Sequence, residues 1–439
     1  MDFDATNLTA IQDHKLIDLN KGAVGHMRNV ILLTIDTLRR DALGIYGSKR
    51  GLSPFIDSIA DRCVVFDRAQ AIGPYTQTSF PGILTSSYYF DYGRSSHLSP
   101  QRVLVSEPLK SGGIVTAAFH SNPYVSDYFG WNRGWDVFRD FMEYEVSDKV
   151  PFLRGKDVNS HVKDWLSSHV KGNNYQSFFL WVHYMDVHEP YIPQREYLEL
   201  AHSSTEAHAL SEDDMFQLFK EVVLKRDISD RQKVALLKEL YEARVREVDD
   251  YVKQFFGILE QLEVLEDCLV IVTSDHGDEF GEHGGLSHDG KMFQELVSVP
   301  LFVFDPERRQ RETCDKVVSS VDIPPTINCL FGLEPVQAFQ GQSLFPLSEY
   351  KERGCFGEAI EKLGHSIKET DKEVYYYLAG NLKIIYRGNI DAWEMYDLQN
   401  DPNEINNIIP TVPKEEEMTC EQAHMKAILK ARIGRWKET

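Results

Sequence analysis

The chain has 439 residues, of which 42% are hydrophobic, and its formal net charge is −21 at pH 7. This length is sufficient for a large core and for a main domain with a smaller second one. The excess of acidic residues argues against nucleic acid or an anionic membrane surface as the main partner, because both repel negative charge. A small anionic substrate would need local positive charge, such as a metal ion flanked by His or Lys side chains.

The sequence contains no apolar run of about 18 residues, so it predicts no membrane span. Residues 1–27 are polar and lack the basic and apolar stretches of a signal peptide, so we expect an N-terminal extension there. The six cysteines are scattered and form no CxxC pair, which is typical of reduced thiols. These features predict a cytoplasmic protein and leave its oligomeric state open.

The first apolar run, VILLTID (residues 30–36), predicts a buried strand that ends in an acid. Asp36 lies either at the carboxyl end of that strand, where open α/β sheets bind ligands, or at the N-cap of the next helix. The hydroxyl-rich stretch GPYTQTSFPGILTS (residues 73–86) follows. Its Thr76, Thr78 and Ser79 all suit an N-cap, and only one of them could also serve as a nucleophile.

A second buried strand is predicted at residues 114–119 and a third within residues 176–193. The third brings two histidines, five positions apart, to its end, and simple alternation cannot point both the same way. We expect His188, in the loop before Pro190, to face a pocket and His183 to lie in the core or to support the pocket. Residues 194–265 have helical periodicity, and residues 194–235 are a possible helical insertion or lid.

The strongest feature is CLVIV followed by TSDHGDEFGEHGG (residues 268–285), a buried strand with an acidic and histidine-rich stretch at its carboxyl end. Asp275 and His276 supply a carboxylate and an imidazole side by side, which suits Zn, Mn or a similar divalent ion. On these residues alone, a cap or turn after the strand remains the alternative.

The alternation of strands and helices predicts an α/β fold whose doubly wound, mainly parallel sheet is flanked by helices on both faces. A further buried strand is expected at residues 299–304. From residue 341 the character changes to alternating segments such as EVYYYLAG and NLKIIYRG, separated by turn residues. We therefore expect a main domain at residues 28–340 and a C-terminal α+β subdomain with a small antiparallel sheet at residues 341–439.

Several short motifs occur together in a fixed order: VILLTIDTLRRDALGIYG, TQTSFPGILTS, HYMDVHEPY, TSDHGDEFGEHGG and MYDLQNDPNEINNI. In order and spacing this series resembles the sulfatase family of the alkaline phosphatase superfamily, over roughly residues 28–408. The resemblance implies an alkaline phosphatase/sulfatase-like catalytic domain that hydrolyses sulfate or phosphate esters with a divalent metal ion.

The resemblance also implies roles for single residues. Thr76 takes the place of the nucleophile, because the family has it nine residues before the Thr that is here Thr85. A rival alignment starts the nucleophile signature at Ser79, but it breaks that spacing and finds Ile83 where an Arg belongs. The implied metal ligands are Asp36, Thr76, Asp275 and His276; the other implied catalytic residues are His188 and Lys291; and the implied substrate or second-metal residues are His188, His288 and Asn122.

The departures from the sulfatase pattern point to one branch of the superfamily. Thr76 cannot be oxidised to formylglycine as Cys or Ser can, and Phe80 stands where the family has Arg. The first Asp pair is reduced to Asp36-Thr37, and the metal dipeptide is Asp-His instead of Asp-Asn. The family's Gly-Lys-Trp-His-type element is also missing. These features resemble the relatives that use a Thr nucleophile and act on phosphodiesters.

We therefore expect a hydrolase that cleaves a small anionic phosphate ester, either a diester or a monoester, through a covalent Thr76 intermediate. One or two divalent ions, Zn, Mn or Ca, would assist. The alternatives are a sulfate-ester hydrolase, a phosphoryl-headgroup transferase, and an inactive binding protein that kept the fold. The absence of an anchor segment weakens the transferase reading.

Overall fold

The structure, a computed structural model, describes residues 16–17, 24–25, 29–93, 95–171, 175–361, 372–412 and 415–438. The predicted N-terminal extension, residues 1–27, lies outside the described residues except for β1 (Leu16–Ile17) and β2 (Val24–Gly25), which pair antiparallel.

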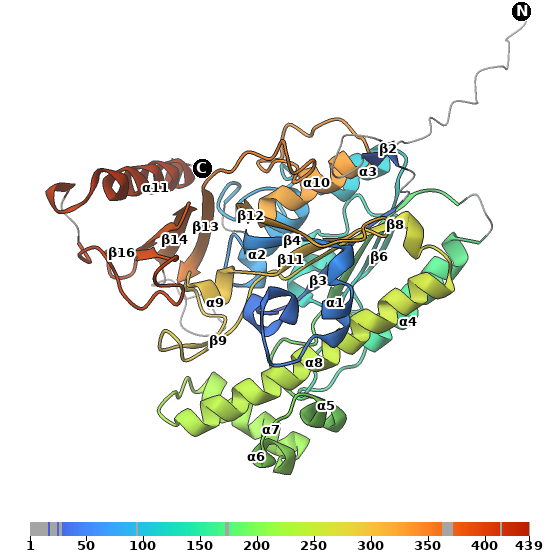
Figure 1. Ribbon diagram of the computed structural model, residues 1–439, viewed down its shortest axis with the longest axis horizontal. Coiled ribbons are helices and arrows are strands. Elements are labelled where there is room, and N and C mark those ends of the chain that lie inside the picture. Colours follow the sequence, from blue (N-terminus) through green and yellow to red (C-terminus); the bar gives the residue numbers. More distant parts are fainter. Residues whose placement is uncertain are drawn as a thin grey trace, which may run out of the picture.

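An eight-stranded sheet forms the centre of the described part of the chain (Figure 1). Its middle strand, β3, is a continuous run of buried residues between two parallel neighbours, β8 and β7. The predicted α/β fold with a mainly parallel sheet is confirmed. In spatial order the strands are β12 (Glu312–Ser319), β4 (Cys63–Gln70), β11 (Leu301–Phe304), β8 (Cys268–Thr273), β3 (Asn29–Ile35), β7 (Phe178–Tyr184), β5 (Val115–Phe119) and β6 (Val137–Arg139).

One strand departs from the parallel arrangement. β11, the strand predicted at residues 299–304, runs antiparallel to both of its neighbours, β4 and β8. A parallel connection needs a long crossover, usually a helix. The chain between β8 and β11 instead forms the short pair β9 (Glu279–Phe280) and β10 (Leu286–Ser287) and the single-turn helix α9 (Gln294–Val297). The chain therefore enters β11 from the edge at which β8 ended.

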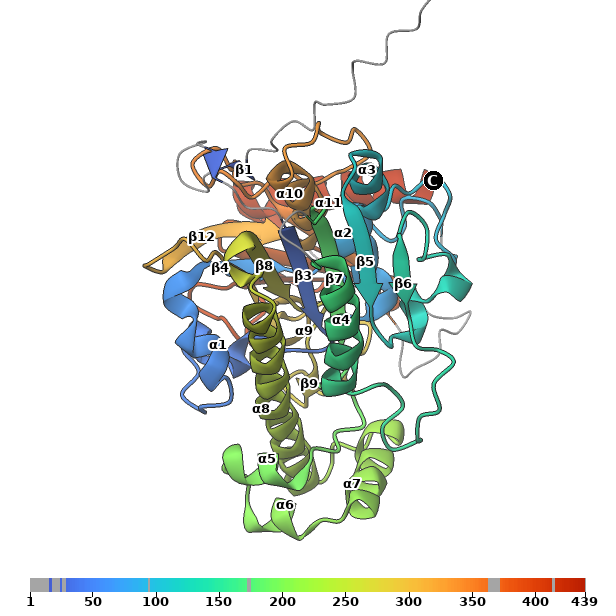
Figure 2. The same cartoon turned by 90° about the vertical axis from the view of Figure 1, so that its right-hand side faces the viewer.

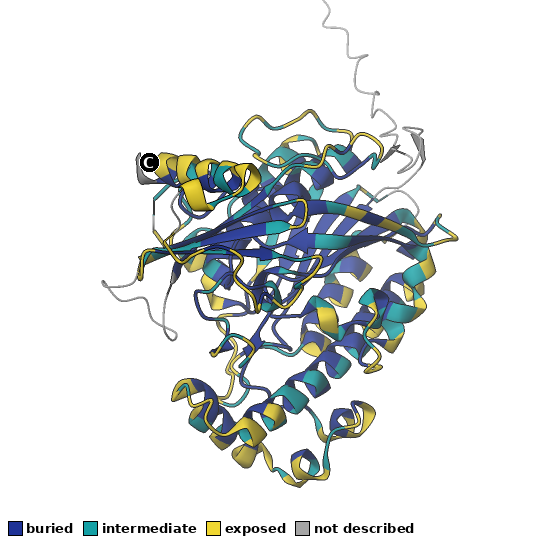
Figure 3. Ribbon diagram, turned by 60° about the vertical axis from the view of Figure 1, so that its left-hand side comes forward, coloured by how far each residue is buried: buried dark blue, intermediate teal, exposed yellow. Residues whose placement is uncertain are grey.

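Helices cover both faces of this sheet (Figures 2 and 3). Because side chains alternate along a strand, Ile31 and Leu33 of β3 join one apolar cluster, and Val30 and Leu32 join the other. The doubly wound arrangement is thus built from two cores. On one face lie α1 (Pro54–Ser58), α4 (Gly155–His169) and α8 (Arg231–Gln261); on the other lie α2 (Thr76–Thr85), α3 (Ser106–Ser111) and α10 (Ile323–Leu330).

Residues 194–235, called the helical segment below, precede and begin the long helix α8 at the lower edge of the molecule in Figure 1. Within α8 the periodic apolar residues are buried, as the helical pattern predicted. No helix in the described ranges is both long and apolar enough to cross a bilayer. The helical segment contains α5 (Arg195–Leu200), α6 (Thr205–Ala209), α7 (Glu212–Phe219) and a π-helical turn (Lys220–Leu224).

The C-terminal part forms the predicted small antiparallel sheet, followed by α11 (Cys420–Glu438). The motif MYDLQNDPNEINN begins in the last strand of this sheet and places Glu404 next to α9. There Glu404 Oε1 lies 2.9 Å from Lys383 Nζ, and both side chains are fully buried. The backbone N–H of Gln294 donates to Glu404 Oε2 at 2.5 Å. The strands are β13 (Cys355–Glu361), β14 (Lys372–Ala379), β15 (Leu382–Arg387) and β16 (Ala392–Asp397).

Candidate active site

Four of the predicted residues meet at the carboxyl edge of the central strands. Asp36 follows β3, Asp275 and His276 follow its neighbour β8, and all three side chains are fully buried. Their potential ligand atoms lie within 4.8 Å of one another. Thr76 is the first residue of α2, and its Oγ1 lies 3.3 Å from Asp275 Oδ2. Strand ends that are far apart in sequence therefore assemble one polar cluster.

Asn122 and His183 hold one oxygen of Asp36. Asn122 Nδ2 donates to Asp36 Oδ2 at 2.8 Å, and His183 Nε2 lies 3.3 Å from the same oxygen. The hydroxyl of Thr34 contacts His183 Nδ1 at 2.8 Å. Asn122, predicted to contact substrate or a second metal, thus lies beside Asp36. His183 is buried and supports Asp36, in line with the core or supporting position expected for it.

The other Asp36 oxygen, Oδ1, is buried and has no hydrogen-bond partner among the described residues. Its distance to His276 Nε2 is 3.7 Å. On the far side of the His276 ring, Nδ1 lies 2.9 Å from the carbonyl of Gly277. Because a carbonyl only accepts, Nδ1 carries the proton and the lone pair of Nε2 faces the two carboxylates. An imidazole lone pair directed at two carboxylates is the arrangement that a cation ligand set needs.

Charge in this cluster is poorly balanced by the protein alone. Burial, together with the negative charge of Asp36, raises the pKa of Asp275 to about 8. Burial also acts to raise the pKa of Asp36, but the hydrogen bond with His183 and the charge of His188 contribute most to lowering it to about 2. A divalent cation between the carboxylates would offset their repulsion. The donor set of two carboxylates, an imidazole and a hydroxyl fits Zn²⁺ or Mn²⁺.

The raised pKa of Asp275 predicts how metal affects stability. Without metal, the folded state holds a proton on Asp275 up to about pH 8, whereas the unfolded chain releases it near pH 4. Folding then binds more protons than unfolding between these values, so stability falls as pH rises through this window. We expect the melting temperatures of metal-loaded and metal-stripped protein to diverge from pH 5 to pH 8. A gap that stays constant across this range would contradict the shared cation site.

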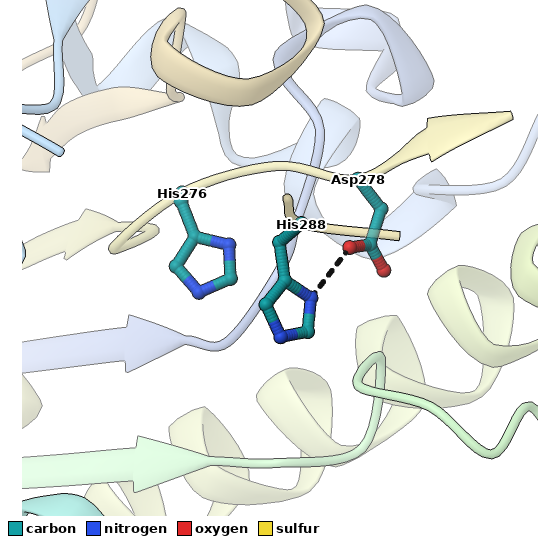
Figure 4. Close-up of side chains that lie close together, drawn as sticks. All are labelled: His276, Asp278 and His288. Carbon is teal, nitrogen blue, oxygen red and sulfur yellow. Dashed lines mark hydrogen bonds and ion pairs between the residues drawn. The ribbon is translucent and has the colours of Figure 1, made fainter. Parts of the chain in front are cut away.

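Two further histidines lie beside this cluster. The ring of His288 lies 4.8 Å from the ring of His276 and 4.9 Å from that of His188, between centroids. Figure 4 shows the rings of His276 and His288 side by side, with the carboxyl of Asp278 beside His288 on the side away from His276. Burial acts to lower the pKa of His188, but the charges of Asp36 and Glu189 contribute to a net rise. The cluster thus favours a cationic imidazole at position 188.

Asp278 was missed by the sequence reasoning, although it lies in the singled-out stretch only two residues after His276. Its Oδ1 lies 2.9 Å from His288 Nδ1, and Tyr191 donates its hydroxyl to Oδ2 at 2.5 Å. The contact with Asp278 engages Nδ1 of His288 and leaves Nε2 for a contact with substrate or an ion. The sequence DHGD has three acidic or imidazole side chains within four residues, and Asp278 is the third of them. This clustering was the signal that could have identified it.

Lys291 and Ser79 make other contacts. The Lys291 ammonium donates to Glu279 at 2.8 Å and to the carbonyl of His283 at 2.9 Å. This arrangement gives no support to substrate contact by Lys291, whose catalytic role stays a prediction. The Ser79 hydroxyl donates to the carbonyl of Gly73 at 2.7 Å, and thus away from the Asp275 carboxylate that Thr76 meets.

Phe80 leaves no cation where the sulfatase pattern has its Arg. Its ring packs edge-on against His183, with 5.2 Å between centroids, and tilts against Trp181 at 5.6 Å. The side chain is fully buried. Positive charge for an anionic substrate must therefore come from histidines or from a bound cation at this end of α2.

Comparison with known families agrees with this arrangement. The family model Sulfatase matches residues 28–333, and the model for the C-terminal region of N-sulphoglucosamine sulphohydrolase matches residues 281–433. The chain belongs to the sulfatase family. This family membership makes it a hydrolase of ester bonds with the alkaline phosphatase-like fold. Sulfatase-family members use a divalent metal ion, in keeping with the cluster around Asp36.

Individual sulfatase relatives are distant. The chain is 24% identical to the uncharacterized sulfatase YidJ of Escherichia coli, over 88% of this chain and 83% of that protein. A solved structure bound to its substrate D-glucosamine-2-N,6-O-disulfate has a TM-score of 0.74 at 19% identity, over 94% of this chain and 99% of the other. The phosphonate monoester hydrolase of Agrobacterium radiobacter has a TM-score of 0.69 at 18% identity, over 93% and 96%. At these identities the two structures establish the fold alone.

Proposed function

We propose that the protein is a metal-dependent hydrolase that cleaves a phosphate ester, diester or monoester, with Thr76 as the nucleophile. The observation that supports this most directly is the 3.3 Å distance between Thr76 Oγ1 and Asp275 Oδ2, inside a buried cluster of two carboxylates and an imidazole. Thr76 also begins α2, where the helix dipole favours negative charge on its oxygen. A threonine needs such activation, because its hydroxyl is a weak nucleophile at neutral pH.

Asp36, Thr76, Asp275 and His276 would hold the ion. A bound divalent ion lowers the pKa of a coordinated hydroxyl and offsets charge on the ester oxygens. Zn²⁺ or Mn²⁺ suits these donors, and Ca²⁺ suits them less well because it prefers oxygen ligands alone. The neighbouring His188, His288 and Asp278 could contact the substrate or bind a second ion, and Asn122 acts by orienting Asp36.

The proposed reaction has two displacements. Thr76 would release its hydroxyl proton to solvent when the cation is bound. Its oxygen then forms a bond to phosphorus while the bond from phosphorus to the leaving oxygen breaks. His188 in its cationic form gives its proton to that leaving oxygen, which agrees with the raised pKa of this histidine. Water then attacks phosphorus and gives a proton back to His188, and the Thr76 oxygen leaves. His288, when protonated on Nε2, donates from this nitrogen to an ester oxygen in both steps.

A sulfate ester is the second candidate substrate. Both matching family models are named for sulfatases, and one structural neighbour binds a sulfated sugar. Against it stand Thr76, which cannot become formylglycine, and Phe80, which brings an apolar ring where sulfatases have an Arg. The phosphonate monoester hydrolase neighbour has the same fold and acts on a phosphorus ester.

The deciding experiment compares turnover of chromogenic sulfate monoester, phosphate monoester, phosphate diester and phosphonate monoester. Metal-stripped protein is reloaded with Zn²⁺, Mn²⁺, Mg²⁺ or Ca²⁺ in turn. We expect a phosphorus ester to be the best substrate, with Zn²⁺ or Mn²⁺ as the best ion, and we expect Ser79→Ala to retain activity. Preferred cleavage of the sulfate ester would favour the second candidate, and metal binding without any turnover would favour a non-catalytic protein or a transferase.

A further inference from the structure

The helical segment meets the candidate active site at one ion pair. Arg226 follows the π-helical turn Lys220–Leu224 and faces Asp289, the residue after His288. Arg226 Nη1 donates to Asp289 Oδ1 at 2.6 Å, and Nη2 donates to Oδ2. Two parallel contacts between a guanidinium and a carboxylate fix direction as well as distance. Asp289 is 4% exposed, so water screens this pair less than a surface pair.

An apolar contact backs the ion pair. Val222 and Val223, in the π-helical turn, belong to the same buried cluster as Leu286 of β10. The π-helical turn packs against β10, and β10 leads directly into His288. The helical segment thus touches the chain on both sides of His288, through Leu286 before it and Asp289 after it.

The backbone at both ends of this contact is strained. Arg226 has φ of 57° and Ser287 has φ of 61°. For residues with a Cβ the left-handed region is sterically unfavourable. Such conformations persist where surrounding contacts hold them, and they cluster at sites where a side chain must be aimed. Here the strained Ser287 immediately precedes His288, and the strained Arg226 forms the ion pair with Asp289, which follows His288.

We propose that Arg226 is a positioning residue that clamps Asp289 and thereby holds the loop of His288 against the active site. The helical segment then holds the His288 side chain in place from outside the central sheet. The proposal rests on the proposed function, in which His288 contacts the ester. Asp278 sets the rotation of the His288 ring, whereas the clamp sets the place of its backbone.

A direct role for Arg226 in substrate binding is the competing explanation, because Glu189 and Glu279 lie close enough to act on its charge and mark it as near the site. The two explanations differ in the role that they give to Asp289. A clamp needs both partners, so Arg226→Gln and Asp289→Asn should have equal effects, and the double variant should be no worse than either. If Arg226 bound the substrate directly, activity would fall in Arg226→Gln and not in Asp289→Asn.

The test measures amide hydrogen exchange of residues 286–291 and steady-state kinetics on the best ester. Lys233→Gln is the matched control, because it removes an ion pair within the helical segment, Lys233 with Glu221 at 2.6 Å, and leaves the Arg226–Asp289 pair in place. We expect exchange in the loop to rise about tenfold in Arg226→Gln and Asp289→Asn but not in the control. We expect kcat to fall about tenfold with little change in KM, because a misplaced group weakens the transition state.

Exchange in Arg226→Gln equal to that in Lys233→Gln would overturn the clamp. Faster exchange with unchanged kcat would overturn its role in positioning, and a raised KM confined to Arg226→Gln would establish direct substrate contact instead. Failure of the proposed function is a separate result: the unaltered protein would then hydrolyse no ester, whereas the exchange measurement needs no substrate. Arg226→Lys, which keeps the charge without the fork, should behave like Arg226→Gln.

Discussion

Replacing Thr76 with alanine is expected to lower kcat/KM for the preferred ester by about 10⁴-fold or more. Removal of a nucleophile that forms a covalent intermediate leaves only the acceleration that comes from binding and charge stabilisation. The fold should survive, because the Thr76 hydroxyl contacts Asp275 whereas α2 is held by its buried apolar residues. Metal-dependent turnover is measured alongside the melting temperature to separate lost chemistry from lost folding.

Two companion variants sharpen this result. Thr76→Ser keeps a hydroxyl and should retain much of the activity, with a trapped phosphoryl or sulfuryl adduct detectable by mass spectrometry of quenched protein. Ser79→Ala removes the rival hydroxyl, which donates to the carbonyl of Gly73, and should leave turnover intact. If Ser79→Ala were inactive while Thr76→Ala turned over normally, the nucleophile would have to be reassigned to Ser79.

Replacing Asp275 with asparagine is expected to change metal binding and stability in opposite directions. Loss of one ligand oxygen that faces Asp36, Thr76 and His276 should cost several kcal/mol of transition-state stabilisation, about 10³-fold in kcat/KM. The metal-free variant should nevertheless melt higher at pH 7 than the metal-free parent. Burial and the charge of Asp36 raise the pKa of Asp275 to about 8, so folding of the parent requires proton uptake that an asparagine avoids.

Asp249→Asn provides the matched control for this pair of effects. Asp249 is a buried aspartate on α8 that accepts from the backbone N–H groups of Phe55 and Ile56, remote from the metal ligands. Its replacement should leave the metal stoichiometry and the metal-dependent turnover unchanged. A metal-free Asp275→Asn that melts lower than its parent would show that the two carboxylates do not oppose each other in the folded state.

Much of the candidate site follows from local sequence. Buried apolar runs that end in Asp36 or in Asp275-His276 identify strands and place these side chains at a sheet edge, because parallel strands share the direction in which they end. The hydroxyl-rich stretch at residues 73–79 predicted a helix start, and α2 begins there at Thr76. Such features depend on residues close together in the chain, so pattern and spacing are sufficient to find them.

Side-chain partners across the fold could not be found in the same way. Lys291 contacts Glu279, Asp278 orients His288, and Asn122 holds Asp36 only because loops from different strands meet in space. The direction of β11 likewise depends on which edge the chain reaches after α9.

The sequence by itself determined the doubly wound sheet, the membership of Asp36, Thr76, Asp275 and His276 in one site, and the family to which that site belongs. The tertiary structure alone decided which oxygen of Asp36 remains without a hydrogen bond, which charges oppose each other, and that Arg226 reaches Asp289 from the helical segment. The physical reason is the distance along the chain between the interacting residues. Periodicity and strand ends are local properties of the chain, whereas burial, charge balance and hydrogen bonding depend on groups brought together only by folding.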